Sequence, residues 1–133
     1  MLSIPAGIRI WLVAGVTDMR RGLDGLSALV QTALSADVLS GQLFIFRGRR
    51  ADRVKIIWHD SDGLCLFYKR LDRGKFVWTH AADGAVLLTP AQLSTLLEGL
   101  IGGGYIGVRV SRTIRSLQQW WSDPDSGRKS IVS

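Results

Sequence analysis

Five cations within nine positions are the first residues whose types and spacing could do chemistry. The stretch "FRGRRADRVKIIWHDSDG", residues 46 to 63, contains Arg47, Arg49, Arg50, Arg53 and Lys55. Four more cations follow in "YKRLDRGK", namely Lys69, Arg70, Arg73 and Lys75. Guanidinium groups fork onto phosphate oxygens, and ammonium groups bind them as point charges. These nine residues are therefore our candidate nucleic-acid-binding residues.

The positive charge of the chain is concentrated in this region. The chain carries a formal net charge of +6, and residues 41–78 hold nine Lys and Arg against four Asp, a net of +5. A field of one sign in one segment attracts polyanions better than the same charge spread over the surface. The alternative is that these residues are solvated strand edges and turns, where Lys and Arg discourage aggregation. Charge alone leaves both interpretations open.

Aromatic residues alternate with these cations. Exposed rings can stack on unpaired bases, but a strand places alternate side chains on opposite faces. Because most of these rings alternate with polar residues, we predict that most belong to the core. The rings are Phe44, Phe46, Trp58, Phe67, Tyr68, Phe76 and Trp78.

Acidic residues offer little support for a metal site. Asp60, Asp62 and Gly63 resemble the start of a calcium loop, but the twelfth position, where that loop needs a glutamate, is Leu71. Turn and cap roles account for Asp60 and Asp62, and equally for Asp18 and Glu98 as candidate magnesium ligands. Asp60 and Asp62 are expected to cap backbone N–H groups and to offset nearby arginines.

Histidine, cysteine and glycine patterns predict no active site either. His59 and His80 lack cysteine partners at ligand spacing, and no base can be assigned to Cys65 as a nucleophile. The glycines of "GGGYIG" formally fit a dinucleotide-binding fingerprint, but they follow a predicted helix instead of a strand. We expect no catalytic residues, no metal and no cofactor, and hence no enzyme.

Composition indicates one folded domain. The 133 residues are 47% apolar and 21% charged, which is typical of a globular chain. The single cysteine excludes an intrachain disulfide and fits a reducing, cytoplasmic setting. Residues 4–16 are interrupted by Arg9 and preceded by no basic region, so neither a signal peptide nor a membrane span is expected.

Strands are expected where short runs rich in Val, Ile, Phe, Trp and Tyr lie between turn residues. In the second strand of the central meander, Val54, Ile56 and Trp58 should point to one face, and Lys55, Ile57 and His59 to the other. The predicted strands are 8–13, 42–46, 53–59, 64–70, 75–78 and 85–88.

Two helices are predicted, each by an apolar stripe. The first follows Asp18 as a cap and carries Leu23, Leu26, Val30, Ala33 and Leu34 at helical spacing. The second, in "TPAQLSTLLEGL", has Thr89 as N-cap, Pro90 at the first helical position, Gln92 completing a capping box, and Gly99 as its stop.

The elements predict an α+β fold: an antiparallel sheet of about five strands with two helices packed on one face. Residues 1–100 form the domain. Residues 101–133 are a divergent, glycine-containing tail in which "SRTIRSLQQWW" has the pattern of a short amphipathic helix.

A known family shares three stretches in the same order and spacing: "TDMRRGLDGL", the basic meander of residues 44–78, and "LTPAQLSTLLEGL". From about Ile8 to Leu100 the sequence resembles the small accessory protein, often called TnpB, of bacterial insertion sequences of the family numbered sixty-six. The resemblance implies a mobile-element protein required for transposition beside a large transposase. The tail departs from the family pattern, because "IGGGYIG" stands where an acidic residue, a tryptophan and a basic run are expected.

The leading hypothesis is a non-enzymatic accessory factor that binds the ends of the element's DNA, the large transposase, or both. An alternative is a protein interaction module whose basic surface meets acidic segments of the transposase without touching DNA. A metal-dependent nuclease is a third and weaker hypothesis.

Overall fold

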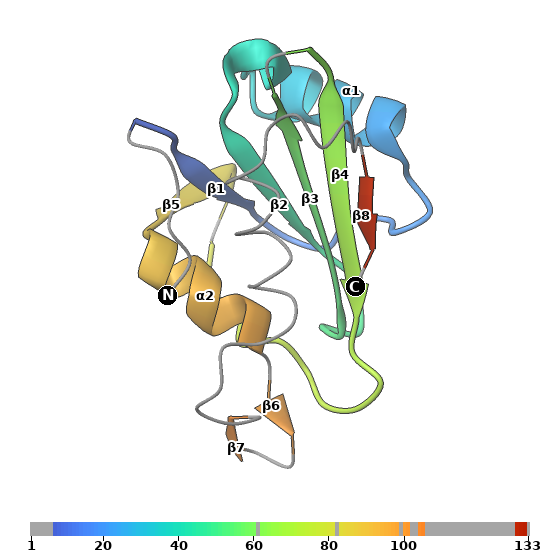
Figure 1. Cartoon of the computed structure of the whole chain (residues 1–133), viewed down its shortest axis with the longest axis vertical. Coiled ribbons are helices and arrows are strands. Elements are labelled where there is room, and N and C mark those ends of the chain that lie inside the picture. The colour runs from blue at the N-terminus through green and yellow to red at the C-terminus, as the bar shows by residue number, and fades with distance from the viewer. Residues whose placement is uncertain are drawn as a thin grey trace.

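The computed structural model describes residues 7–60, 62–81, 83–98, 100–101, 104–105 and 130–132. One sheet and two α-helices make up most of this part of the chain (Figure 1). The elements are β1 (Ile10–Val13), α1 (Leu23–Ala33), the 3-10 turn η1 (Val38–Ser40), β2 (Leu43–Arg47), β3 (Arg53–His59), β4 (Leu64–Arg70), β5 (Ala85–Leu88), α2 (Pro90–Glu98), β6 (Leu100–Ile101), β7 (Gly104–Tyr105) and β8 (Ser130–Val132).

The main sheet has the strand order β5-β1-β2-β3-β4-β8 and is mixed, which corrects the purely antiparallel prediction. The pairs β2–β3, β3–β4 and β1–β5 are antiparallel, as expected for the meander, whereas β1–β2 and β4–β8 are parallel. Helix α1 connects β1 to β2, and such a crossover returns the chain to the same end of the sheet. The α+β class itself is confirmed.

Strand β3 divides its side chains between two hydrophobic clusters, as its alternation predicted. Val54, Ile56 and Trp58 belong to one cluster with Leu93, Leu96 and Leu97 of α2. On the other face, Ile57 packs in a cluster with Leu26 and Val30 of α1. Both faces of the sheet are therefore covered by a helix.

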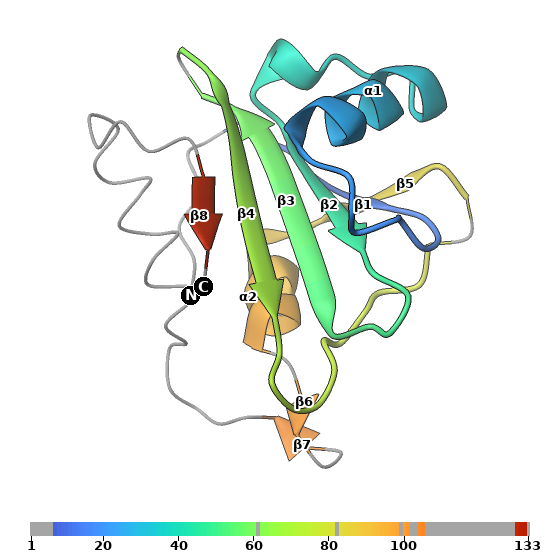
Figure 2. The same cartoon turned by 90° about the vertical axis from the view of Figure 1, so that its right-hand side faces the viewer.

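Our prediction that both helices pack on one face is wrong. Figures 1 and 2 show α1 and α2 on opposite sides of the sheet, in agreement with the two clusters. An apolar stripe shows that a helix is buried, but it does not tell which face of the sheet covers it.

The N-terminus of α2 has the predicted capping box. The Thr89 N–H donates to Gln92 Oε1 at 2.7 Å, and the Gln92 N–H donates to Thr89 Oγ1 at 3.1 Å. Helix α1 differs from expectation, because its N-cap is Gly22 and no side chain caps it. The predicted cap, Asp18, instead binds Arg20. Gly99 lies outside the described residues.

Residues 75–78 are not the strand that we predicted. Lys75 forms a single bridge, and residues 76–78 have no regular secondary structure. Its hydrogen bonds go to the turn before β3, because the Phe76 N–H donates to the Ala51 carbonyl. Most of the predicted tail lies outside the described residues, but its residues 130–132 add β8 to the sheet. No helix in the described part of the chain could span a membrane.

Candidate nucleic-acid interface

Three connections meet at one end of the main sheet. Because β1 and β2 are parallel, the loop 14–22 after β1 and the turn 48–52 after β2 leave the sheet at the same end. Strand β4 runs antiparallel to β3 and ends there too, so the segment 71–84 also starts at this end. We call this end, formed by 14–22, 48–52 and 71–84, the basic end.

Ala51 joins two of these connections. Its φ of 64° is uncommon for a residue other than glycine. Its carbonyl accepts hydrogen bonds from the Phe76 N–H at 2.9 Å and from Trp78 Nε1 at 3.1 Å. The Leu71 N–H donates to the Asp52 carbonyl at 2.8 Å. The two basic turns predicted from the sequence are therefore held side by side.

The loop after β1 packs against the same turn. The Thr17 N–H donates to the Arg47 carbonyl at 2.8 Å, and Thr17 is buried. Gly48 permits this close approach, since a Cβ there would lie 2.9 Å from Met19 Cγ and 3.2 Å from Arg53 Cβ. A side chain at position 48 would push Met19 away, so the glycine is needed for the packing of the loop.

Five of the nine predicted cations are exposed and free to meet a ligand. Two come from the 48–52 turn, and three come from the end of β4 and the chain that follows it. They are Arg49, Arg50, Arg70, Arg73 and Lys75. Since both turns lie at the basic end, the structure brings these five cations to the same end of the sheet.

The other four cations are half-buried, and the two lysines among them make hydrogen bonds within the fold. Lys55 Nζ donates to the Arg21 carbonyl at 2.7 Å and lies 5.2 Å from the centroid of the Tyr68 ring. Lys69 Nζ reaches the Leu97 carbonyl, at the C-terminus of α2, at 3.5 Å. These two lysines point to opposite faces of the sheet, so they do not belong to one ligand surface.

Burial lowers the pKa of both lysines. Desolvation lowers the pKa of Lys55 below its ordinary value, while the charge of Asp18 opposes the shift. Desolvation also lowers the pKa of Lys69, and the charge of Glu98 opposes it. Each ammonium is thus stabilised less by water than a surface lysine would be, and local partners replace part of its hydration.

Arg47 and Arg53 stand between the core and the exposed cations. The guanidinium of Arg47 lies 5.7 Å from the centroid of the Trp78 ring, a cation–π distance. Within the described residues, the Nε atoms of Arg47 and Arg53 and Oδ1 of Asp52 are buried without a hydrogen-bond partner. Arg53 also lies directly opposite Arg70 in the β3–β4 ladder. Like charges in that position destabilise a sheet, so an anion bound there would relieve the repulsion.

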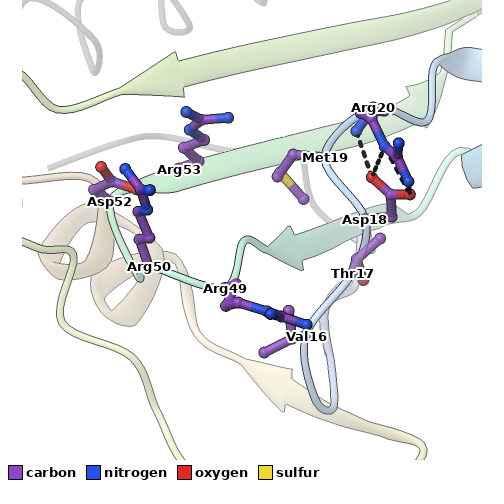
Figure 3. A pocket seen from close by; sticks show the side chains of 9 residues that line it. All are labelled: Val16, Thr17, Asp18, Met19, Arg20, Arg49, Arg50, Asp52 and Arg53. Atoms are coloured by element: carbon purple, nitrogen blue, oxygen red, sulfur yellow. Dashed lines mark hydrogen bonds and ion pairs between the residues drawn. The ribbon is translucent and has the colours of Figure 1, made fainter.

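A cleft of about 720 Å³ opens between the loop after β1 and the turn after β2. Figure 3 shows Met19 between the Asp18–Arg20 pair and the residues of the turn. We call it the arginine cleft. Its lining residues are Val16, Thr17, Asp18, Met19, Arg20, Arg49, Arg50, Asp52 and Arg53.

The sequence analysis did not predict the side of this cleft that the loop after β1 forms, because it assigned Asp18 to a helix cap. Arg20 donates to both carboxylate oxygens of Asp18, with Nη2 at 2.8 Å from Oδ2 and Nε at 3.0 Å from Oδ1. This pairing holds the pKa of the Asp18 carboxyl well below its usual range. The available signal was "TDMRR", which supplies two cations directly after β1.

The aromatic residues are mostly core, as predicted. Five of the seven rings are buried. Tyr68 and Trp78 are half-buried and remain within reach of the surface. Tyr68 already contacts Lys55, and Trp78 contacts Arg47 and packs edge-on against Phe76.

The acidic turn before β4 is distant from the basic end. Asp60 accepts a hydrogen bond from the Asp62 N–H at 3.2 Å, which confirms its local capping role. Because the turn follows β3, it lies at the opposite end of the sheet, and the expectation that it offsets the arginines is wrong. Cys65 is buried. Within the described residues no three His, Cys, Asp or Glu side chains gather where they could hold a metal ion.

The fold and site define a small α+β domain that gathers exposed Lys and Arg side chains at one end of its sheet. The chain belongs to the IS66 Orf2-like protein family, whose model matches residues 8–102. The uncharacterized protein y4hO of Sinorhizobium fredii is 50% identical over 100 residues, which are 75% of this chain and 87% of that protein. The uncharacterized protein y4jC of the same organism is 41% identical over 100 residues, 75% of this chain and 86% of its own length. No solved structure matches the chain.

Proposed function

We propose that this protein is a non-enzymatic accessory factor in the transposition of an insertion sequence and that it binds DNA through the basic end. Membership of the IS66 Orf2-like family supports the association with transposition. The large transposase of the same element is the second proposed partner, and DNA and transposase can share the protein if they use different faces.

The observation that carries the DNA-binding proposal is the exposure of five cations from two joined turns. Arg49 and Arg50 lie on one turn, and Arg73 and Lys75 on the segment hydrogen-bonded to Ala51, while Arg70 ends β4. Exposed guanidinium groups bind phosphate oxygens in forked pairs. Because the turns are held together by the fold, little chain entropy is lost when both meet one DNA backbone.

Salt dependence measures this contact directly. Each phosphate neutralised on duplex DNA contributes about 0.9 to the slope of log affinity against log salt concentration, so five contacts give a slope of about −4.5. Changing both Arg49 and Arg50 to Ala should weaken binding to all duplex sequences and reduce the steepness of the slope by about 2.

Arg9→Ala provides the control. Arg9 is exposed, precedes β1 and therefore lies at the end of the sheet opposite the basic end. Binding of purified variants to labelled element-end and random duplexes, followed by fluorescence anisotropy across a salt series, should separate Arg50→Ala from Arg9→Ala. An equal loss in these two variants would refute a localised DNA interface. Unchanged DNA affinity in Arg49→Ala/Arg50→Ala, with loss of transposase pull-down, would favour the protein interaction module.

A further inference from the structure

We infer that the arginine cleft binds one unpaired nucleotide of a DNA strand. This inference rests on the proposed function and specifies the form of DNA that the site binds. The nucleotide's phosphate meets the guanidinium groups of the turn 49–53, and its base lies against Val16 and Met19. The protein therefore prefers single-stranded or unpaired DNA over an intact duplex.

The shape of the cleft is the first reason. A volume of about 720 Å³ lies within the usual range for sites that enclose a small ligand, roughly 300 to 1,000 Å³. A nucleotide in a duplex is stacked between its neighbours, and it can enter a concave site only after leaving the stack. Leaving the stack costs least when the base is already unpaired. A cleft of this size therefore selects for an unpaired nucleotide.

The charge of its walls is the second reason. Asp18 is already neutralised by Arg20 through paired hydrogen bonds, and that pair stands at one side of the cleft (Figure 3). On the opposite side, Arg49 and Arg50 are exposed, and the buried Nε of Arg53 has no hydrogen-bond partner within the described residues. This side of the cleft therefore carries three guanidinium groups and one carboxylate, that of Asp52, and its net positive charge favours binding of a phosphate.

The apolar part of the lining is the third reason. Val16 is 54% exposed and gives the cleft an apolar surface beside its arginines. Met19 lines the same cleft, and thioether sulfur makes favourable contacts with aromatic rings. A base offers the ring that this lining would cover. An acidic peptide would satisfy the arginines but would leave the apolar side chains in water.

The cleft is also built before a ligand arrives. The Thr17 N–H is bonded to the Arg47 carbonyl, and Met19 is packed against Gly48. These contacts fix one wall against the other, so binding does not have to order the loop first.

Val16→Glu tests the cleft, and Leu39→Glu is its matched control. Both residues are exposed, with Val16 at 54% and Leu39 at 59%, and both substitutions add the same charge. Leu39 lies in η1, before β2, at the end of the sheet opposite the basic end. Thermal unfolding of both variants establishes that they fold. Affinity is then measured for one labelled DNA strand, alone and annealed to its complement.

We expect Val16→Glu to weaken binding of the single strand about tenfold more than Leu39→Glu does, a difference of about 1.4 kcal/mol. On the duplex, the added carboxylate beside Arg49 and Arg50 should cost Val16→Glu no more than about fivefold relative to Leu39→Glu, a smaller loss than on the single strand. Equal losses on the single strand would overturn the cleft site while leaving the proposed duplex binding intact. A wild-type protein that binds neither form of DNA would overturn both proposals.

A second measurement does not depend on variants. The chain has two methionines, Met1 and Met19, so methyl-labelled methionine gives a spectrum in which Met19 can be assigned. Titration with thymidine 5′-monophosphate should shift the Met19 methyl signal and leave that of Met1 unchanged. A Met19 signal that does not move at saturating nucleotide, or one that moves only with an oligoglutamate peptide, would contradict the inference.

Discussion

Trp78→Phe is the sharpest test of how the basic end is held together. The change removes the indole N–H that donates to the Ala51 carbonyl at 3.1 Å, and it keeps an aromatic ring beside Arg47 and Phe76. A hydrogen bond contributes about 0.5 to 1.5 kcal/mol to stability. The low half of that range applies, because the Ala51 carbonyl still accepts the Phe76 N–H.

A weaker cation–π contact adds to this loss. Tryptophan is the best aromatic partner for a guanidinium, and replacement by phenylalanine should cost about a further 0.5 kcal/mol. The free energy of unfolding should therefore fall by about 1 to 1.5 kcal/mol. For a chain of this length, that corresponds to a thermal midpoint lowered by roughly 3 to 7 °C.

Trp11→Phe is the control, because it makes the same chemical change at a position outside the basic end. Trp11 is also half-buried, and its Nε1 donates one hydrogen bond, to Gln42 Oε1. Both variants are unfolded in denaturant and followed by circular dichroism, and their duplex DNA affinities are measured under folded conditions. We expect similar losses of stability but weaker DNA binding only in Trp78→Phe, because only that change loosens the segment that carries Arg73 and Lys75.

Two results would refute this reasoning. A free energy of unfolding unchanged by Trp78→Phe would mean that the bond to Ala51 does not hold the two turns together. Equal DNA affinities in the Trp78 and Trp11 variants, despite the expected loss of stability, would mean that the turns do not act as one surface.

Two further predictions concern stability. Leu96→Ala should lower the free energy of unfolding by about 2 to 5 kcal/mol, because Leu96 is buried between α2 and the sheet. The control, Thr95→Ala on the exposed face of α2, should change it by less than about 0.5 kcal/mol. A thermal midpoint of unfolding that Leu96→Ala does not move would show that this face is open to a partner. Burial lowers the pKa of Lys69, so between that folded-state pKa and the ordinary value of 10.5 the unfolded chain binds more protons than the folded one, and stability rises with pH. Denaturant unfolding should therefore show the wild type gaining stability relative to Lys69→Met as the pH rises from 7 towards 10, and a constant difference would contradict the burial of this charge.

Local features of the fold could be predicted from the sequence because they depend on neighbouring residues. The Thr89–Gln92 capping box and the alternation of β3 are patterns within a few positions, and both are confirmed. The side of the sheet on which each helix lies is set by chain crossing, which leaves no local pattern. Residues 75–78 have strand-forming side chains, but their backbone partner is Ala51, more than twenty positions earlier.

The candidate site likewise has one part that could be predicted from the sequence and one part that could not. The grouping of the two basic turns could be predicted from the meander, because antiparallel strands of similar length return their turns to the same end. The contribution of Asp18, Met19 and Arg20 could not, since it depends on β1 pairing in parallel with β2. Lys55 and Lys69 were grouped with the exposed cations, although alternation along neighbouring strands sends them to opposite faces.

The parallel pairing of β1 and β2 places the loops of the arginine cleft, the ligand site proposed above, outside the strands and helices of the fold. Both loops that form the arginine cleft begin where a strand leaves the sheet, and the two hydrophobic clusters consist mainly of residues from the helices and strands. Loops in such positions tolerate changes in length and composition better than the elements that they connect. Randomising the exposed positions Val16, Arg49 and Arg50 should therefore yield variants with altered ligands on an unaltered framework, so that this small domain can serve as a scaffold for selecting new binding specificities.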